Sequence, residues 1–211
     1  MSTEDARIPV EFYFDYICPF CYVGSHRLRR ITQRYPVSVQ YRFVEIHPDN
    51  PSQGRPVEAL GYPAAQWAQM TEAVTQMARD EGLPLAERRF TTNSRRALLL
   101  ARTVLRQRPD AFLGLHDALF HAYFAEQHNI GDPEVLVGIA RGHGVEECLT
   151  AAWEQQDALA GLLEDVEAAQ AIGLTGVPTL VVGGRAFPGA VSTDTLEAAL
   201  EREGVTPSED D

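Results

Sequence analysis

A pair of cysteines near the start of the chain is the feature best suited to chemistry. Cys18 and Cys21 are separated by two residues, Pro19 and Phe20. Residues three positions apart share one face of a helix, which brings the two sulfur atoms within bridging distance. A thiolate attacks a disulfide through a mixed disulfide, and a neighbouring thiol can then resolve that adduct. The C-x-x-C spacing therefore predicts a thiol–disulfide redox site.

The segments around the cysteines indicate how the chain positions them. Residues 8–14 are rich in β-branched and aromatic side chains, which predicts a buried strand. Pro19 suits the first turn of a helix, because its missing N–H is not needed there and its φ is already helical. Cys18 is thus expected at a helix N-terminus, where free N–H groups and the helix dipole favour the thiolate. We expect Pro19 and Phe20 to tune the site.

Two other uses of Cys18 and Cys21 compete with redox chemistry. A structural zinc site needs a second pair of ligands, and the candidates are His26, His47 and the distant Cys148. A static disulfide is rare in a reducing compartment. We therefore favour a redox dithiol and predict no metal.

Three further histidines and the third cysteine carry weaker signals. His116, His121 and His128 are spaced by five and seven residues, which does not give the one-face pair of a helical metal site. We interpret them as partly buried or surface side chains. Cys148 has apolar helical neighbours and is expected to behave as a small core residue, although a regulatory thiol role stays open.

Composition restricts the classes of partner. The chain has 211 residues and a net charge of -12, and all 18 of its positive side chains are arginine. The acidic balance argues against nucleic acid or an anionic membrane as partner, and the lack of lysine excludes Schiff-base chemistry. The first residues lack the basic and apolar regions of a signal peptide, and no apolar run approaches the ~20 residues of a membrane span. We expect a cytoplasmic protein that is a monomer or a homodimer.

Segments with the residue pattern of β-strands occur only towards the two ends of the chain. Residues 37–46 alternate as a second strand, and the order strand, helix, strand suits a parallel pair. From about residue 50 to 160 the pattern is helical, and we interpret Trp67, Met70, Met77 and Trp153 as its core, while the segment 48–63 is a candidate to line the site. Residues 175–184 and 185–188 then predict a hairpin, followed by a final helix.

The order of these motifs resembles the DsbA-like family, and within it the branch of FrnE and 2-hydroxychromene-2-carboxylate isomerase. The matching stretches are residues 14–24, 93–97 and 173–179, and the resemblance covers about residues 8–203. It implies an α/β thioredoxin fold, with a mixed central sheet flanked by helices and a large all-helical insertion. We therefore predict a discontinuous thioredoxin-like domain, 7–49 with 166–204, and an inserted helical domain, 50–165.

The resemblance also implies roles for individual residues. Cys18 corresponds to the attacking thiolate and Cys21 to the resolving thiol. A cis Val177–Pro178 bond is implied beside them, with the backbone of Val177 free to pair with an extended substrate. No cofactor beyond the dithiol is expected. Partners would be protein or small-molecule thiols and disulfides, with glutathione as a possible co-substrate.

One departure from the family pattern concerns a buried acid. DsbA-type strands carry a glutamate six positions before the attacking cysteine, which is thought to help proton transfer from the resolving thiol. Here that position is Phe12, with Glu11 and Asp15 nearby. Because a one-residue offset in a strand reverses the face, neither carboxylate inherits the role by default.

Three functions remain open at this point. The leading hypothesis is a thiol–disulfide oxidoreductase. The isomerase and kappa-class glutathione transferase relatives place a serine where Cys18 stands, and a glutathione-dependent isomerase or transferase is the alternative. A third possibility is a non-enzymatic chaperone or binding module that uses the apolar surface beside the cysteines.

Overall fold

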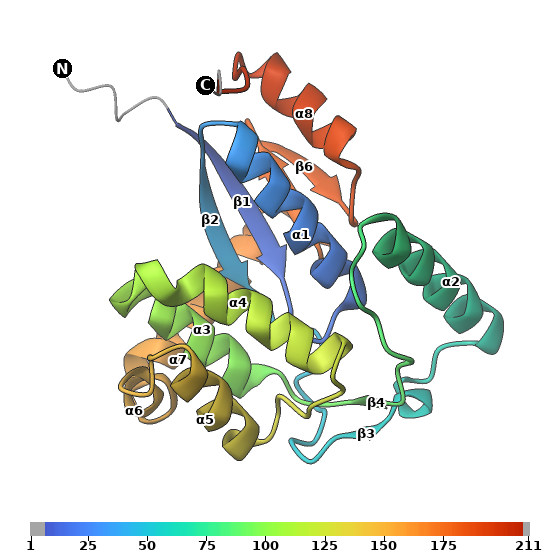
Figure 1. The fold of residues 1–211 in the computed structure, drawn as a ribbon, viewed down its shortest axis with the longest axis vertical. Coiled ribbons are helices and arrows are strands. Elements are labelled where there is room, and N and C mark those ends of the chain that lie inside the picture. Colours follow the sequence, from blue (N-terminus) through green and yellow to red (C-terminus); the bar gives the residue numbers. More distant parts are fainter. Residues whose placement is uncertain (1–6, 209–211) are drawn as a thin grey trace.

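A four-stranded mixed sheet forms the centre of the protein, which a computed structural model describes over residues 7–208 (Figure 1). The strand order is β2-β1-β5-β6, so that the first strand is internal. Strand β1 pairs in parallel with β2 and antiparallel with β5, and β6 closes the hairpin with β5. The four strands are β1 (Ile8–Phe14), β2 (Val37–Phe43), β5 (Thr179–Val182) and β6 (Arg185–Pro188).

Helix α1 (Pro19–Arg34) connects the two parallel strands, as a parallel pair requires a crossover. Alternate side chains of β1 point to opposite faces of the sheet. Phe12 and Phe14 belong to the main hydrophobic cluster, which also holds residues of α1 and of α8 (Thr193–Arg202). Tyr13 faces the other way and packs with Ala169 of α7 (Gln156–Ala171). Helices therefore cover both faces of the sheet.

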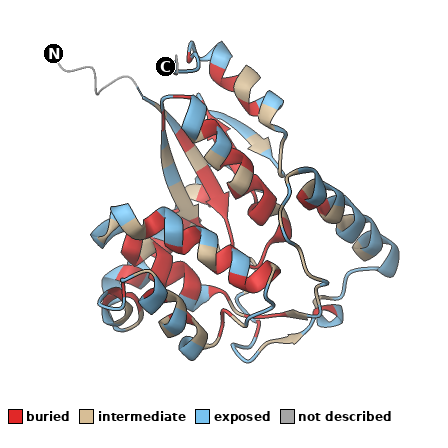
Figure 2. Cartoon of the chain, in the orientation of Figure 1, coloured by how far each residue is buried: buried red, intermediate tan, exposed pale blue. Residues whose placement is uncertain are grey.

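The middle of the chain is mainly helical and shares the hydrophobic core of the sheet. Helix α3 is buried along most of its length (Figure 2). On α4, the ring of Phe112 packs against Phe43 at the end of β2, and the ring of Phe120 packs against Phe14 at the end of β1. Helix α2 instead lies beside α1, and most of its surface is exposed. The helices of this region are α2 (Ala64–Asp80), α3 (Arg95–Gln107), α4 (Pro109–Phe124), α5 (Pro133–Gly142) and α6 (Cys148–Glu154), with a 3₁₀ turn at Val57–Leu60.

The prediction that this region is entirely helical is wrong in one detail. Strands β3 (Arg55–Pro56) and β4 (Phe90–Thr91) form a separate antiparallel pair. Each has two residues, which is too short for an alternating pattern to be visible in the sequence. Within residues 7–208 the central sheet takes no strand from this region, as predicted.

A second difference concerns the end of β2, which stops at Phe43 and not at Ile46. The backbone N–H of Ile46 donates a 2.8 Å hydrogen bond to the carboxylate of Asp15 instead of to a strand. Strand β1 itself ends at Phe14, which is paired with Phe43, so the chain beyond Phe43 has no strand residue to pair with and the Asp15 side chain takes the N–H of Ile46.

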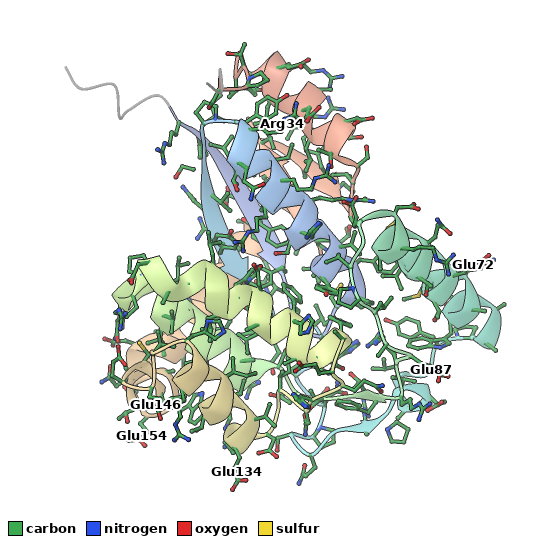
Figure 3. The ribbon with its side chains drawn as sticks, viewed as in Figure 1. Arg34, Glu72, Glu87, Glu134, Glu146 and Glu154 are labelled. Atoms are coloured by element: carbon green, nitrogen blue, oxygen red, sulfur yellow. The ribbon has the colours of Figure 1, made fainter. Side chains whose placement is uncertain are left out.

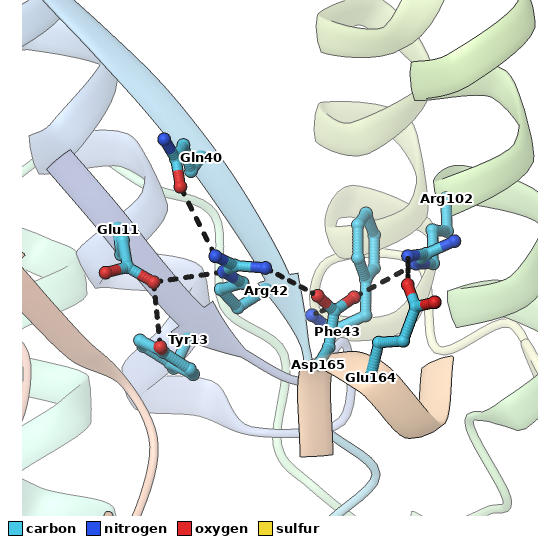
Figure 4. A network of polar contacts seen from close by, with 8 residues as sticks. All are labelled: Glu11, Tyr13, Gln40, Arg42, Phe43, Arg102, Glu164 and Asp165. Carbon is cyan, nitrogen blue, oxygen red and sulfur yellow. Dashed lines mark hydrogen bonds and ion pairs between the residues drawn. The ribbon is translucent and has the colours of Figure 1, made fainter. Parts of the chain in front are cut away.

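The predicted boundary at 165/166 falls inside α7, where a polar network ties the helices to the sheet (Figure 4). Asp165 is buried and accepts hydrogen bonds from Arg102 of α3 at 3.0 Å and from Arg42 of β2 at 3.3 Å. The oxygen that accepts from Arg102, Oδ2, also accepts from the backbone N–H of Phe43 at 3.4 Å. The division into 7–49 with 166–204 and 50–165 stays a prediction about folding units.

The surface carries the excess of acidic side chains. Figure 3 shows such residues as Glu72, Glu134 and Glu154 pointing away from the ribbon, and all three are exposed. Within residues 7–208 no helix is long and apolar enough to span a membrane. The same part of the chain holds no group of three or more metal-ligating side chains.

Candidate active site

Cys18 is the N-cap residue of α1, with an extended backbone (φ -90°, ψ 115°). Its carbonyl accepts from the backbone N–H groups of Cys21 at 3.0 Å and Tyr22 at 3.2 Å, and Pro19 follows as the first helical residue. The helix therefore starts where the sequence predicts. The first turn contains no acidic residue, and its N–H groups and dipole favour negative charge at the sulfur.

The two cysteines differ in access. The Cys18 residue is 6% exposed and lines an open cleft, whereas Cys21 is 0% exposed. Both are free thiols. Burial raises the pKa of Cys21 well above its usual value, and a hydrogen bond with Cys18 raises it further. Cys18 is thus the sulfur that a substrate can reach, while Cys21 holds its proton beneath it.

The segment predicted to bind substrate lies beside Cys18. The Cys18 thiol donates to the carbonyl oxygen of Val177, with an Sγ–O distance of 3.5 Å. The Val177–Pro178 peptide bond is cis, as the resemblance implies. Gly24, on the next turn of α1, lies under this segment, since a Cβ placed there would stand 3.3 Å from Cγ of Pro178. The structure therefore brings together the four residues predicted from the two ends of the chain.

Asp15 is the buried acid that the sequence left undecided. It is 0% exposed and accepts from the backbone N–H of Ile46 at 2.8 Å and of Ile17 at 3.3 Å. Burial raises its pKa to about 7, although these hydrogen bonds oppose the shift. Its charge also acts to raise the pKa of Cys21. A carboxyl group with this pKa beside a buried thiol can accept or return a proton near neutrality.

Glu11, the other candidate, has a different role. Its carboxylate accepts from the hydroxyl of Tyr13 at 2.8 Å and from Nε of Arg42 at 3.0 Å. These partners place it in the polar network that includes Asp165 (Figure 4). Glu11 therefore belongs to the sheet surface and not to the site.

The cleft in front of Cys18 has a volume of about 370 Å³. Pro19 and Phe20 line it from the start of α1, and Thr175, Gly176 and Val177 line it from the segment before β5. Leu60 and Tyr62 contribute from the segment 48–63, which the sequence singled out as a possible lining. The remaining lining residues are Ile17, Ile46, His47, Trp67, Met70 and Arg88. Aromatic and apolar walls with few polar groups are typical of a substrate site.

Trp67 and Met70 correct an expectation, since we interpreted them as core of the helical region. Both are only partly buried and line the cleft from α2. Their helix keeps few buried residues, Val74 and Ala78, for contact with the rest of the protein. The i, i+3 spacing of Trp67 and Met70 indicates an apolar helix face, but it does not indicate which part of the protein that face lines.

His116 also differs from the prediction of a partly buried or surface side chain. It is 1% exposed, and its two ring nitrogens are hydrogen-bonded to the hydroxyls of Tyr16 at 2.8 Å and Ser25 at 2.7 Å. Burial lowers the pKa of His116 to about 3, so the ring is neutral. His121 and His128 are exposed as expected. Cys148 is wholly buried, and burial raises its pKa, which agrees with its prediction as a core residue.

Comparison with known proteins identifies the family. The family model described as DSBA-like thioredoxin domain matches residues 9–201, and the chain belongs to this family. A crystal structure of a probable DsbA oxidoreductase from Streptomyces coelicolor is 25% identical, with a TM-score of 0.81 over 94% of this chain and 91% of that one. The structure of a 2-hydroxychromene-2-carboxylate isomerase has the same fold, at 21% identity and a TM-score of 0.75 over 93% of this chain and 96% of that one.

Two curated sequences are also similar. The uncharacterised protein YwbO of Bacillus subtilis is 26% identical over 216 aligned residues, which cover 93% of this chain and 97% of that protein. A 2-hydroxychromene-2-carboxylate isomerase of a Pseudomonas strain is 40% identical over 37 residues, which is 18% of each chain. The chain is thus a DsbA-like thioredoxin-fold protein of a family that includes oxidoreductases and isomerases.

Proposed function

We propose that this protein is a thiol–disulfide oxidoreductase that exchanges disulfides with protein or small thiol substrates through Cys18 and Cys21. The observation that carries the proposal is the position of Cys18, at the start of α1, open to the cleft and 3.5 Å from the carbonyl oxygen of Val177. An enzyme that acts by nucleophilic attack needs its sulfur at such a cleft, with a second thiol behind it.

The reaction proceeds in two steps. The thiolate of Cys18 attacks a substrate disulfide, a mixed disulfide forms, and the first substrate thiolate leaves. Cys21 then gives its proton to the carboxylate of Asp15 and attacks the sulfur of Cys18, which releases the second thiolate. The substrate disulfide gains two electrons and the protein dithiol loses two. The reverse sequence oxidises a substrate dithiol.

Val177 and Pro178 are the proposed substrate-binding residues, because they border the sulfur and the cleft together. An extended substrate segment can bind to the backbone there by strand addition. Glutathione is a proposed co-substrate, as the thiol that restores the reduced dithiol. No cofactor beyond Cys18 and Cys21 is part of the reaction.

A glutathione-dependent isomerase or transferase is the second candidate. The local match of 37 residues to a 2-hydroxychromene-2-carboxylate isomerase favours it. In such a mechanism the side chain at position 18 only donates a hydrogen bond to the glutathione sulfur, and a hydroxyl serves for this purpose.

The variant Cys18→Ser distinguishes the two. We expect it to lose reduction of an insulin-type disulfide, because a hydroxyl that no base activates is a poor nucleophile at neutral pH. We also expect no turnover of an aromatic electrophile with glutathione. Retained or raised turnover of the electrophile by Cys18→Ser would favour the isomerase, and retained disulfide reduction would refute the dithiol mechanism.

A further inference from the structure

The cleft in front of Cys18 differs in charge from the molecule as a whole. The chain has 30 acidic and 18 basic side chains. Among the described residues that line the cleft there is no aspartate or glutamate, whereas Arg88 and His47 are present. A positive side chain in a cleft that has no acidic lining residue favours a local potential of opposite sign to the overall charge.

Arg88 is held in place without an acidic partner. Its guanidinium lies over the ring of Trp67, 5.4 Å from the centroid, and 5.9 Å from that of Phe124. One terminal nitrogen is 3.5 Å from the carbonyl oxygen of Ile17, which is a long hydrogen bond. Its Nε is buried and has no hydrogen-bond partner, and Arg88 makes no ion pair within residues 7–208. The guanidinium therefore lies close to the residue that precedes Cys18 and has no carboxylate partner in the described part of the chain.

The neighbouring residues agree with a positive site. Burial lowers the pKa of His47, and the charges of Arg88 and Arg55 lower it further. Arg55 also has a buried Nε without a partner in the described part of the chain. A neutral His47 can still donate one hydrogen bond to an anion while Arg88 supplies the charge.

We infer that the cleft selects disulfides that carry a carboxylate near the reacting S–S bond, and that the guanidinium of Arg88 binds this carboxylate. Arginine binds carboxylates through paired N–H donors, and Trp67 fixes the plane of the group. The inference rests on the proposed function and names the substrate class of the same site. Carboxylated small disulfides and cystine peptides with an adjacent acidic residue share this chemistry.

The first test compares two probes that both react with thiols. 5,5′-Dithiobis(2-nitrobenzoate) carries two carboxylates, and 4,4′-dithiodipyridine is neutral. Arg88→Met keeps the length and the apolar contact with Trp67 but removes the charge. We expect it to slow oxidation of the reduced protein by the carboxylated probe about tenfold, which corresponds to one charged hydrogen bond, and by the neutral probe less than about twofold.

Arg89→Met is the matched control, because Arg89 is the next residue, is 75% exposed and pairs with Glu87 outside the cleft. It makes the same change in net charge, and we expect less than about a twofold effect on either probe. A purely structural Arg88 would slow both probes equally when substituted. That result, or no change with the carboxylated probe, would overturn the inference.

A second test needs only the wild-type protein. The net charge of -12 repels an anionic probe, so added salt would raise the rate if this global field dominated. Binding at Arg88 predicts the opposite, a rate that falls about threefold between about 20 mM and about 300 mM sodium chloride, with no change for the neutral probe. A rate that rises with salt would contradict the inference even if Arg88→Met does not fold.

Two further measurements test the substrate class and the dithiol reaction separately. Cystine peptides with glutamate or glutamine beside the cystine show whether the carboxylate of a peptide is recognised as well as that of a small disulfide.

Thiol release tests the proposed function independently. Two equivalents per protein indicate that Cys21 resolves the adduct, whereas one equivalent and a stable adduct would refute the dithiol mechanism whichever probe is faster.

Discussion

The sulfur of Cys18 lies 3.5 Å from the carbonyl oxygen of Val177, although 159 positions separate the two residues. The antiparallel register of β1 and β5 explains this contact, because Tyr13 pairs with Thr179. The end of the first strand is thus beside the start of the fifth, and the loops that continue from them meet. The sheet topology therefore brings the two distant segments of the chain together at the site.

Cys21→Ser should trap substrates on Cys18. The mixed disulfide cannot be resolved, since a serine hydroxyl does not displace a thiol from Cys18. We expect a covalent adduct that persists until a reductant is added, seen as added mass on the peptide that contains residue 18. Cys148→Ser is the control and should give no persistent adduct, because it keeps Cys21 to resolve the mixed disulfide and removes a thiol that is wholly buried and does not line the cleft. Equal trapping by the wild-type protein would argue against a resolving role for Cys21.

Alkylation should follow the order of access. At about pH 6 we expect iodoacetamide to modify Cys18 at least ~10-fold faster than either other cysteine, because thiolate character and exposure control the rate. Cys21 and Cys148 are each 0% exposed, and burial raises the pKa of both. Peptide mass spectrometry of the reduced protein measures the order. Earlier labelling of Cys148 or Cys21 would show that the nucleophile is misassigned.

Much of the site could be predicted from local signals. The C-x-x-C pair, the strand before it and the proline that starts α1 are neighbours in sequence, so their arrangement follows from short-range rules. The cis Val177–Pro178 bond, in contrast, was implied only by the resemblance to a family. The mixed character of the central sheet was implied by the same resemblance, whereas the strand order β2-β1-β5-β6 comes from the structure.

Other parts of the site could not be predicted, because they depend on contacts between distant elements. Asp15 is buried beneath the loop that follows β2, where the N–H of Ile46 meets its carboxylate. Trp67 reaches the cleft through the position of α2 beside α1, and Arg88 reaches it from the irregular segment between α2 and β4, and the helical pattern specifies neither placement. His116 is enclosed by aromatic rings of β1, β2 and α4, including Phe14 at 5.0 Å. Each needs tertiary structure to be recognised.

Two buried groups should have opposite effects on stability as the pH changes. Asp15 has a folded-state pKa near 7, above its unfolded value, so the folded protein binds the extra proton and its stability falls from about pH 4 to about pH 7. His116 has a folded-state pKa near 3, below its unfolded value, so the unfolded protein binds the extra proton and stability rises from about pH 3 to about pH 6.5. The two slopes oppose each other between about pH 4 and about pH 6.5.

Single substitutions should reveal how each group changes the free energy of unfolding with pH. Without the carboxyl, Asp15→Asn should gain stability as the pH rises across this window, by on the order of 3 kcal/mol. His116→Gln should lose stability over the same window by a similar amount, on the order of 3 kcal/mol. Urea unfolding at a series of pH values measures the free energy of unfolding of both variants. The slope of this free energy against pH is compared, because a loss of packing that does not depend on pH leaves the slope unchanged. Slopes of the same sign in the two variants would show that these groups do not titrate as proposed.

Asp165→Ala should destabilise the junction between the sheet and the helices. The carboxylate is 4% exposed and accepts from Arg42, Arg102 and the backbone of Phe43. Its removal takes the most buried acidic partner from Arg42 and Arg102, which are only 31% and 22% exposed. Each arginine keeps a second acidic partner, Glu11 or Glu164, so we expect a loss of about 2 kcal/mol in the free energy of unfolding, less than for a fully buried pair. Glu164→Ala is the matched control. This neighbour is 72% exposed and also pairs with Arg102, at 3.4 Å, so its removal should change the free energy by less than about 0.5 kcal/mol. If the two substitutions had equal effects, the network around Asp165 would be no more than a surface ion pair.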